Sequence, residues 1–184
     1  MSVTEPFYSI WDDHWKDDID DLHNYIENNF HKYEDPFSIA PGKVTTTKVI
    51  SWKKLLEFKK MKDFLDEVYW TNQVDYGYNL TQRLGIFPAI YNVYDSKDKG
   101  KYDWHIDSSG NGNFDIKLTL IINLSKEYTG GDFQLKVSDY DQTIKEFIPG
   151  SVIMFRSPTL HRVTPVLTGV RRTLTLFLEG PRWV

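Results

Sequence analysis

The sequence predicts an α+β protein that is mainly β, a β-sandwich with helices from its N-terminal half packed on one sheet. Apolar residues recur at helical spacing in the N-terminal half, whereas the C-terminal half has many short strand-like runs separated by turn signals. A chain of 184 residues can bury one full hydrophobic core. We therefore expect a single domain over residues 1–184, with a mostly helical buttress in residues 1–76 and the sandwich in residues 77–184.

Two amphipathic helices are expected in the N-terminal half. A short strand over residues 4–11 should lead into a helix over residues 12–30, which an aspartate at either of its first two positions can cap. Residues 36–42 contain two prolines and a glycine and are expected to form a loop. A second helix is expected over residues 52–70, with lysines opposite an apolar stripe. Each helix has one face suited to packing.

Strand-like runs dominate after Gly77. They are short, rich in β-branched and aromatic residues, and punctuated by Asp-Ser, Gly-Gly, Pro-Gly and Thr-Gly pairs. Such a series predicts a sandwich or barrel. The runs cover residues 87–94, 101–106, 116–124, 132–137, 144–147, 152–155 and 171–178.

The composition argues against several classes of protein and site. A formal net charge of −4 provides no broad cationic field for duplex nucleic acid. Without cysteine there is no disulfide or thiolate ligand, so any metal must take nitrogen or oxygen ligands. No basic and apolar leader opens the sequence, and no run of about 18 apolar residues occurs. We expect a soluble, cytoplasmic protein that does not bind membranes, and the oligomeric state stays open.

A His-x-Asp motif, His105 and Asp107, lies at the end of one strand-like run. Alternate residues of a strand share a face, so an imidazole and a carboxylate at this spacing can bind one ion. A pair of this kind also arises by chance and needs a third ligand. His161 follows the run SVIMFRSPTL, which a sandwich can fold back opposite the first. Two histidines and one carboxylate leave coordination positions open, which suits iron(II), whereas a structural zinc site usually takes four protein ligands.

Arg171 follows His161 by ten residues, on the last long strand-like run. A buried guanidinium there can pair with a carboxylate of a small acidic co-substrate. Strand alternation would place Thr173 and Thr175 on the face of Arg171, and Arg172 on the other. We favour Arg171 over Arg172 as the inward residue because it shares its face with these threonines.

Three stretches of the C-terminal half resemble the iron(II)- and 2-oxoglutarate-dependent dioxygenases, specifically the prolyl 4-hydroxylase-like group. They are YNVYDSKDKGKYDWHIDSS (91–109), KLTLIINLSKEYTGGDFQL (117–135) and FIPGSVIMFRSPTLHRVTPVLTGVRRTLTLF (147–177). Together they cover about half of the chain in the family's order. The resemblance implies a double-stranded β-helix, a cupin-like jelly roll with the metal at its open end.

The resemblance also implies the cofactors and the residues that hold them. The cofactors would be iron(II), 2-oxoglutarate as co-substrate and dioxygen, with ascorbate as a candidate addition. His105, Asp107 and His161 would be the iron ligands and the catalytic residues. Arg171 would bind the distal carboxylate of 2-oxoglutarate. Candidate hydroxyl donors to that carboxylate are Thr173 and either Tyr91 or Tyr94, and weaker candidates for substrate contact are Tyr102 and Trp104.

The substrate is the least defined part of the expected activity. The resemblance implies hydroxylation of a C–H bond with release of succinate and carbon dioxide, with a peptidyl residue such as proline favoured. Prolyl hydroxylases usually carry lysine where Arg171 stands and tryptophan where Phe177 stands, which weakens the assignment of proline. The alternatives are a free amino acid or small metabolite as substrate, a non-catalytic cupin-like metal-binding module, and a zinc hydrolase.

Overall fold

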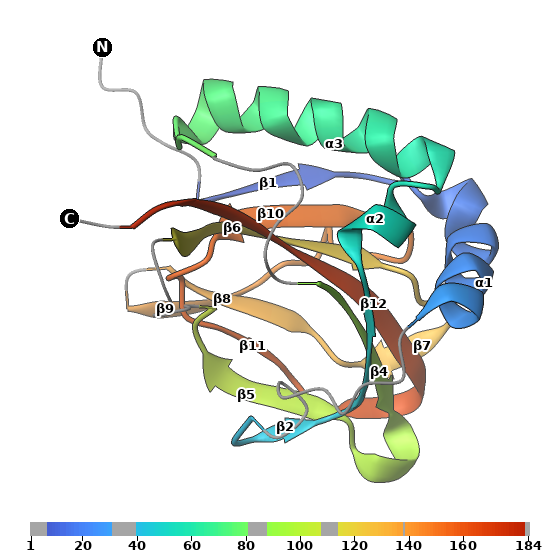
Figure 1. Ribbon diagram of the computed structural model, residues 1–184. Helices are drawn as coiled ribbons and strands as arrows, with labels where there is room; N and C mark the ends of the chain where they lie inside the picture. Colours follow the sequence, from blue (N-terminus) through green and yellow to red (C-terminus); the bar gives the residue numbers. More distant parts are fainter. Residues whose placement is uncertain (1–6, 31–39, 81–87, 108–113, 138, 183–184) are drawn as a thin grey trace.

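Two antiparallel sheets form the body of the protein in a computed structural model, which describes residues 7–30, 40–80, 88–107, 114–137 and 139–182 (Figure 1). In order, the seven-stranded sheet contains β1 (Tyr8–Trp11), β10 (Val152–Arg156), β6 (Phe114–Asn123), β12 (Val166–Pro181), β4 (Ala89–Asp95) and β3 (Thr46–Ile50), and β7 (Tyr128–Gly130) pairs with β12 outside this path. The five-stranded sheet contains β2 (Lys43–Val44), β5 (Lys101–His105), β11 (His161–Val163), β8 (Phe133–Val137) and β9 (Tyr140–Thr143).

Helices cover the outer face of the seven-stranded sheet (Figure 1). Their apolar sides, with Leu22, Ile26, Phe64 and Val68, join one buried cluster with Leu176 of the sheet. The amphipathic patterns of the sequence therefore serve packing against the sheet. The helical elements are η1 (Lys16–Asp18), α1 (Ile19–Asn29), α2 (Trp52–Leu55), α3 (Lys59–Thr71), the single π-helical turn η3 (Asn72–Tyr76) and η4 (Ser96–Asp98).

The seven-stranded sheet is buried on both faces, and the long strand β12 shows how. Leu174 and Leu176 face the helices and belong to the helical core cluster. Thr173 and Thr175 point the other way, between the two sheets, and are also buried. This alternation confirms the expected separation of the polar face from the apolar face of this strand. The polar face is the one that carries Arg171.

The expected fold class is confirmed, and the helix boundaries differ from the prediction. The first α-helix begins at Ile19, not at residue 12 or 13, because the Trp15 N–H donates to the Gly150 carbonyl and fixes the chain before the helix. The second helical stretch is divided into α2 and α3 by a turn. Ser51 caps α2 by accepting from the Lys54 N–H.

The predicted division into a helical and a strand half was too simple. β2 and β3 belong to the N-terminal half, and each joins one of the two sheets. The strand expected over residues 144–147 is wrong, since β9 ends at Thr143 and Ile144 and Phe147 fill the core from a turn. β7 and β11 have three residues each, too few for a periodic pattern. Residues 4–6, 36–39 and 87 of the predicted elements lie outside the described residues.

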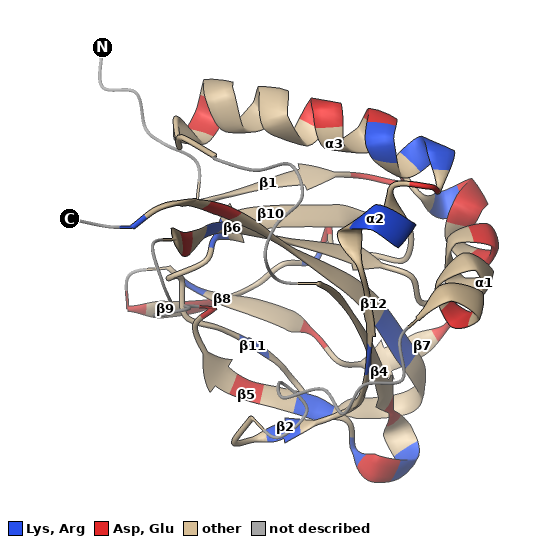
Figure 2. Cartoon of the chain, in the orientation of Figure 1, with Lys and Arg blue, Asp and Glu red and all other residues tan. Residues whose placement is uncertain are grey.

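Charged residues on the helical layer form no continuous field of one sign. Figure 2 shows acidic residues along α1 and α3 and basic residues on α2 and at the start of α3. Ion pairs join Asp18 to Lys60 and Asp20 to Lys126. Within the described part of the chain, no helix is both long and apolar enough to cross a bilayer.

The packing of α1 predicts a clear loss of stability for Leu22→Ala. Leu22 is fully buried, so truncation removes its transfer free energy and leaves a cavity, lowering the free energy of unfolding by about 2–5 kcal/mol. Asn24→Ala is the matched control, since Asn24 is exposed on the same helix and should change stability by less than about 0.5 kcal/mol. Urea denaturation measures both, and equal effects would show that α1 does not pack as described.

Candidate metal and co-substrate site

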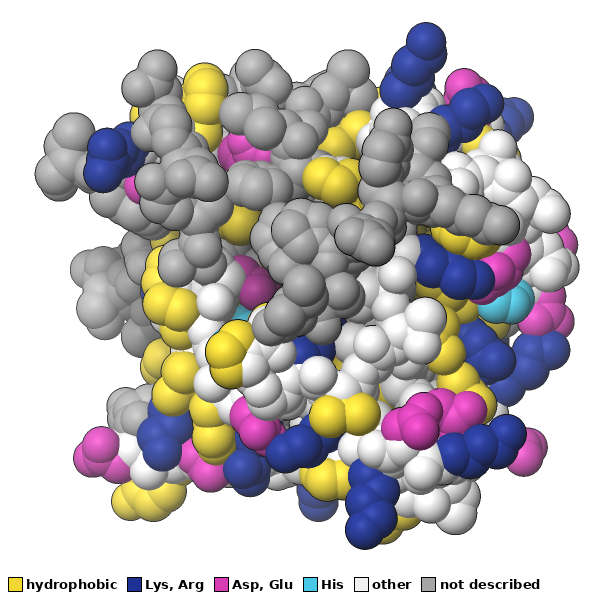
Figure 3. Space-filling model, turned by 60° about the horizontal axis from the view of Figure 1, so that its bottom comes forward, with side chains coloured by type: hydrophobic (Ala, Val, Ile, Leu, Met, Phe, Trp, Pro, Cys, Tyr) yellow, Lys and Arg dark blue, Asp and Glu magenta, His cyan; other side chains and the backbone are white. Residues whose placement is uncertain are grey.

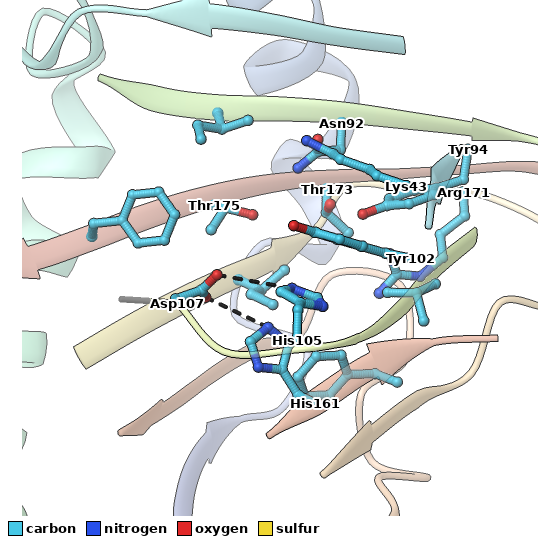
Figure 4. Close-up of a pocket in the computed structure, with 15 residues that line it drawn as sticks. Lys43, Asn92, Tyr94, Tyr102, His105, Asp107, His161, Arg171, Thr173 and Thr175 are labelled. Carbon is cyan, nitrogen blue, oxygen red and sulfur yellow. Dashed lines mark ion pairs between the residues drawn. The ribbon is translucent and has the colours of Figure 1, made fainter. Parts of the chain in front are cut away.

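A cavity opens between the two sheets, and its wall carries most of the residues singled out in the sequence (Figure 4). β4 and β12 form one wall from the larger sheet, and β5, β8 and β11 form the opposite wall. In Figure 3, a histidine and an acidic side chain are visible in a recess of the face turned forward. The polar lining residues are Lys43, Asn92, Tyr94, Tyr102, His105, Asp107, His161, Arg171, Thr173 and Thr175.

His105, Asp107 and His161 converge at one end of this cavity. Each offers one ligand atom, and the three atoms lie within 4.8 Å of one another. The Asp107 carboxylate is 3.8 Å from His105 Nε2 and 3.5 Å from His161 Nε2. The pairing of β11 with β5 explains the convergence, because His161 lies directly opposite His105. Side chains directly opposite in an antiparallel pair point to the same face.

An irregularity in β5 decides which of its aromatic residues reach the cavity. Between the pairs His161 with His105 and Val163 with Tyr102, β5 has one extra residue, a β-bulge. The bulge brings Tyr102 to the face of His105, where the two rings stack with centroids 3.4 Å apart. Trp104 points outward instead and lies over the Arg162 guanidinium. Tyr102 therefore lines the cavity and Trp104 does not, and substrate contact by either residue stays a prediction.

Both imidazoles are oriented in the same way. His105 Nδ1 lies 2.7 Å from the Asp103 carbonyl oxygen, and His161 Nδ1 lies 2.9 Å from the Thr159 carbonyl oxygen. A carbonyl oxygen only accepts, so each Nδ1 carries the proton and donates it. Each Nε2 then keeps its lone pair and faces Asp107. This is the tautomer that a metal ligand requires.

Burial keeps these imidazoles neutral. Burial, and then the neighbouring His161, lower the pKa of His105 to about 4. Burial also lowers the pKa of His161 to about 4, although its hydrogen bond to the Thr159 carbonyl opposes the shift. Burial raises the pKa of Asp107. Neutral imidazoles form no ion pair with Asp107. At neutral pH, the Nε2 lone pairs of His105 and His161 and the Asp107 carboxylate therefore face one common space, as the ligands of a single ion would.

Asp107 is held by residues that the sequence did not single out. Its backbone N–H donates to the Ser157 carbonyl, and its carboxylate accepts from the Thr119 hydroxyl at 2.9 Å. The Thr119 and Ser157 hydroxyls are also 2.9 Å apart, and both side chains are buried. Thr119 lies within the apolar run of β6. Threonine is common in strands, so its position in the sequence gave no sign of this role. The carboxylate is therefore fixed in orientation.

Arg171 is the most unusual polar residue of the cavity. Its side chain is 1% exposed, and Nε and both terminal nitrogens have no hydrogen-bond partner among the described residues. The guanidinium lies 5.2 Å from the Tyr94 ring centroid and 5.7 Å from that of Phe147. Gly131, at a φ of +62°, makes room for it, since a Cβ there would come 2.9 Å from Arg171 Cδ. A buried charge without a counter-ion is costly and calls for an anion.

The alternation of side chains along β4 places the two candidate tyrosines on opposite faces of the sheet. Tyr94 pairs directly with Arg171 across the strands and lines the cavity, and burial raises its pKa to about 12. Tyr91 lies on the opposite face, where its hydroxyl is 2.7 Å from His23 Nδ1. The assignment of Tyr91 to the co-substrate is therefore wrong, because three positions along a regular strand reverse the face. Thr173 lines the cavity beside Arg171.

Comparison with known proteins identifies the family. Residues 89–179 match the 2OG-Fe(II) oxygenase superfamily. The chain belongs to this superfamily. The matched segment begins in β4 and ends in β12, so it contains the triad, Tyr94 and Arg171.

Curated relatives of this oxygenase include PKHD-type hydroxylases. One from Synechococcus sp. strain CC9605 is 35% identical over 81 residues, which are 43% of this chain and 36% of that protein. Another from Shewanella oneidensis is 30% identical over 103 residues, 53% of this chain and 45% of that protein. The chain thus spans about a third to a half of the length of these relatives.

Solved structures share the fold of this oxygenase at low sequence identity. A viral collagen prolyl hydroxylase from Paramecium Bursaria Chlorella virus-1, in complex with 2OG, has a TM-score of 0.70 at 15% identity and covers 98% of this chain and 99% of its own. A Trichoplax adhaerens prolyl hydroxylase in complex with a hypoxia inducible factor peptide has a TM-score of 0.69 at 16% identity, covering 95% and 84%. These similarities confirm the jelly-roll fold.

The lowered pKa values predict an unusual titration for the metal-free protein. His105 and His161 should stay neutral at pH 6 and protonate only near pH 4, as measured by NMR of the imidazole signals. The unfolded chain binds these protons already near pH 6.5, so both groups stabilise the folded state above pH 6.5 and lose that contribution as the pH falls through about 4. Titration of either imidazole near 6.5 would contradict the described burial.

Proposed function

We propose that the oxygenase is an iron(II)- and 2-oxoglutarate-dependent hydroxylase in which His105, Asp107 and His161 hold the iron. The observation that carries this proposal is the presence, in one cavity, of this triad and of the buried Arg171 guanidinium. Two imidazole nitrogens and a carboxylate oxygen suit iron(II), and no fourth protein ligand belongs to the group among the described residues. Open positions are what a metal needs to bind a co-substrate.

Arg171 fits the distal carboxylate of 2-oxoglutarate. Its guanidinium can donate two parallel hydrogen bonds to a carboxylate, which would supply both the missing partners and the missing counter-charge. Tyr94 and Thr173 present hydroxyl groups in the same cavity and are candidates for further donors. Tyr94 stays protonated at neutral pH because burial raises its pKa to about 12, so it can donate.

The chain's own residues would bind, orient and shield the reactants. The carbonyls of Asp103 and Thr159 fix both imidazoles, and Thr119 fixes Asp107, so the metal geometry is set before binding. When bound, iron(II) and 2-oxoglutarate supply oxygen activation, with decarboxylation to succinate and carbon dioxide coupled to hydroxylation of a substrate C–H bond. Phe133 and Val163 give part of the cavity an apolar lining, which would limit the access of water to the reactants.

A peptidyl residue such as proline is the favoured substrate. Relatives named hydroxylases and the fold neighbour solved with a peptide support a peptide in this role. Arg171 and Phe177 depart from the residues usual in prolyl hydroxylases, so a free amino acid or small metabolite stays as the alternative. A non-catalytic cupin-like module would have no use for a buried, unpartnered arginine in the metal cavity.

Loss of one proposed ligand should abolish the iron site. Under anaerobic conditions, iron(II) and 2-oxoglutarate together should give the wild-type protein a visible charge-transfer band, and His105→Ala should lack it because only two ligands remain. His23→Ala is the control, since His23 lies on the helical side and should leave the band unchanged. A wild-type protein without the band, combined with zinc-dependent hydrolysis, would refute the oxygenase proposal.

Arg171 and Arg172 should differ sharply in their effect on co-substrate use. Arg171→Ala should raise the half-saturating 2-oxoglutarate concentration by at least about thirtyfold, because it removes one member of a buried charge pair. Arg171→Lys should retain part of the affinity, and Arg172→Ala, which alters the other face of β12, should change it by less than about twofold. Iron binding, measured separately, should survive in all three. A larger effect of Arg172→Ala would contradict the assignment.

A further inference from the structure

Lys43 is a charged residue of the cavity that no part of the proposed iron and 2-oxoglutarate site uses. It comes from β2, and Figure 4 shows its side chain in the cavity, with Tyr102 between it and the triad. Its ammonium nitrogen lies 5.5 Å from the centre of the Tyr102 ring, which itself stacks on His105. At most one aromatic side chain therefore separates this charge from a proposed iron ligand.

The backbone fixes Lys43 in this position. β2 pairs with β5, and Lys43 lies directly opposite Tyr102, so the two side chains share the cavity face. The Asp103 N–H donates to the Gly42 carbonyl, and the Lys43 N–H donates to the Ala40 carbonyl. Gly42 has a φ of +73°, and a Cβ there would come 2.6 Å from an Asp103 carboxylate oxygen. The turn before Lys43 therefore presses closely against β5.

Position and charge assign Lys43 to the substrate rather than to the co-substrate. β2 is an edge strand of the five-stranded sheet, and Lys43 is half-buried, whereas Arg171 lies fully buried. In the proposed complex, the charges of iron(II) and 2-oxoglutarate cancel, as do those of Asp107 and Arg171. Among the described residues that line the cavity, Lys43 then adds a positive charge. A positive field near a reaction site favours anionic groups.

We propose that Lys43 selects substrates that carry a carboxylate next to the residue to be hydroxylated. This inference rests on the proposed hydroxylase function and names the substrate class more closely, as a peptide with an acidic residue flanking the target. Lys43 already takes part in another interaction, so the incoming carboxylate would share its three N–H donors or replace that partner. An amide in place of the carboxylate would offer an acceptor oxygen without the charge.

Matched peptides test this selection. The probes are short blocked peptides with a central proline, in pairs that differ only in an adjacent Asp or Asn, or Glu or Gln. With iron(II), 2-oxoglutarate and dioxygen, the wild-type protein should form succinate and oxygenated peptide about tenfold faster from the acidic member at low concentration. Lys43→Met should remove that preference and leave the anaerobic charge-transfer band unchanged. Lys43→Arg should keep most of the preference.

Lys101→Met provides the matched control. Lys101 lies on the neighbouring β5, forms an ion pair with Asp103 and does not line the cavity, so the acidic preference should persist. Equal use of acidic and amide peptides by the wild type, or use of neither while the band is present, would overturn the inference. Loss of the band in Lys43→Met would also overturn it, because Lys43 would then serve the co-substrate. Absence of the band in the wild type would instead refute the underlying hydroxylase function.

Discussion

The antiparallel pairing of β5 with β11 is the constraint on which the site depends. It sets His161 opposite His105, and the chain after β5 places Asp107 against both. The same pairing is supported on its other edge by β2, which brings Lys43 to the cavity. A register shift of one residue would turn both histidines away from each other. The proposed metal site is therefore a product of strand register more than of local sequence.

The two sheets also create the environment that the site needs. The larger sheet is buried on both faces, by helices outside and by the cavity inside, so β12 can present a fully buried Arg171. Burial keeps the imidazoles neutral and ready to bind a metal without proton competition. Burial of a guanidinium without a partner also destabilises the folded chain, and the proposed acidic co-substrate would relieve this cost on binding.

The motif and the family resemblance named the three residues that converge in the cavity, although they lie on or beside the short strands β5 and β11. The alternation of side chains along β12 was enough to select Arg171 over Arg172 as the inward residue. The same rule did not show which of Tyr91 and Tyr94 faces inward, because that depends on how β4 pairs with β12. The bulge that turns Trp104 outward leaves no local signal. Lys43 lies on a strand of only two residues. Strand propensity in the sequence does not predict so short a strand, because it forms only through its pairing with β5.

The central claim is that one metal and one acidic co-substrate occupy this cavity together. A crystal structure with manganese(II) in place of iron(II) and with 2-oxoglutarate tests it most directly. The account predicts one ion bound by Nε2 of His105, Nε2 of His161 and a carboxylate oxygen of Asp107, with the distal carboxylate of 2-oxoglutarate on Arg171. An ion held elsewhere, or a co-substrate carboxylate bound to Lys43 with Arg171 still unpartnered, would contradict it.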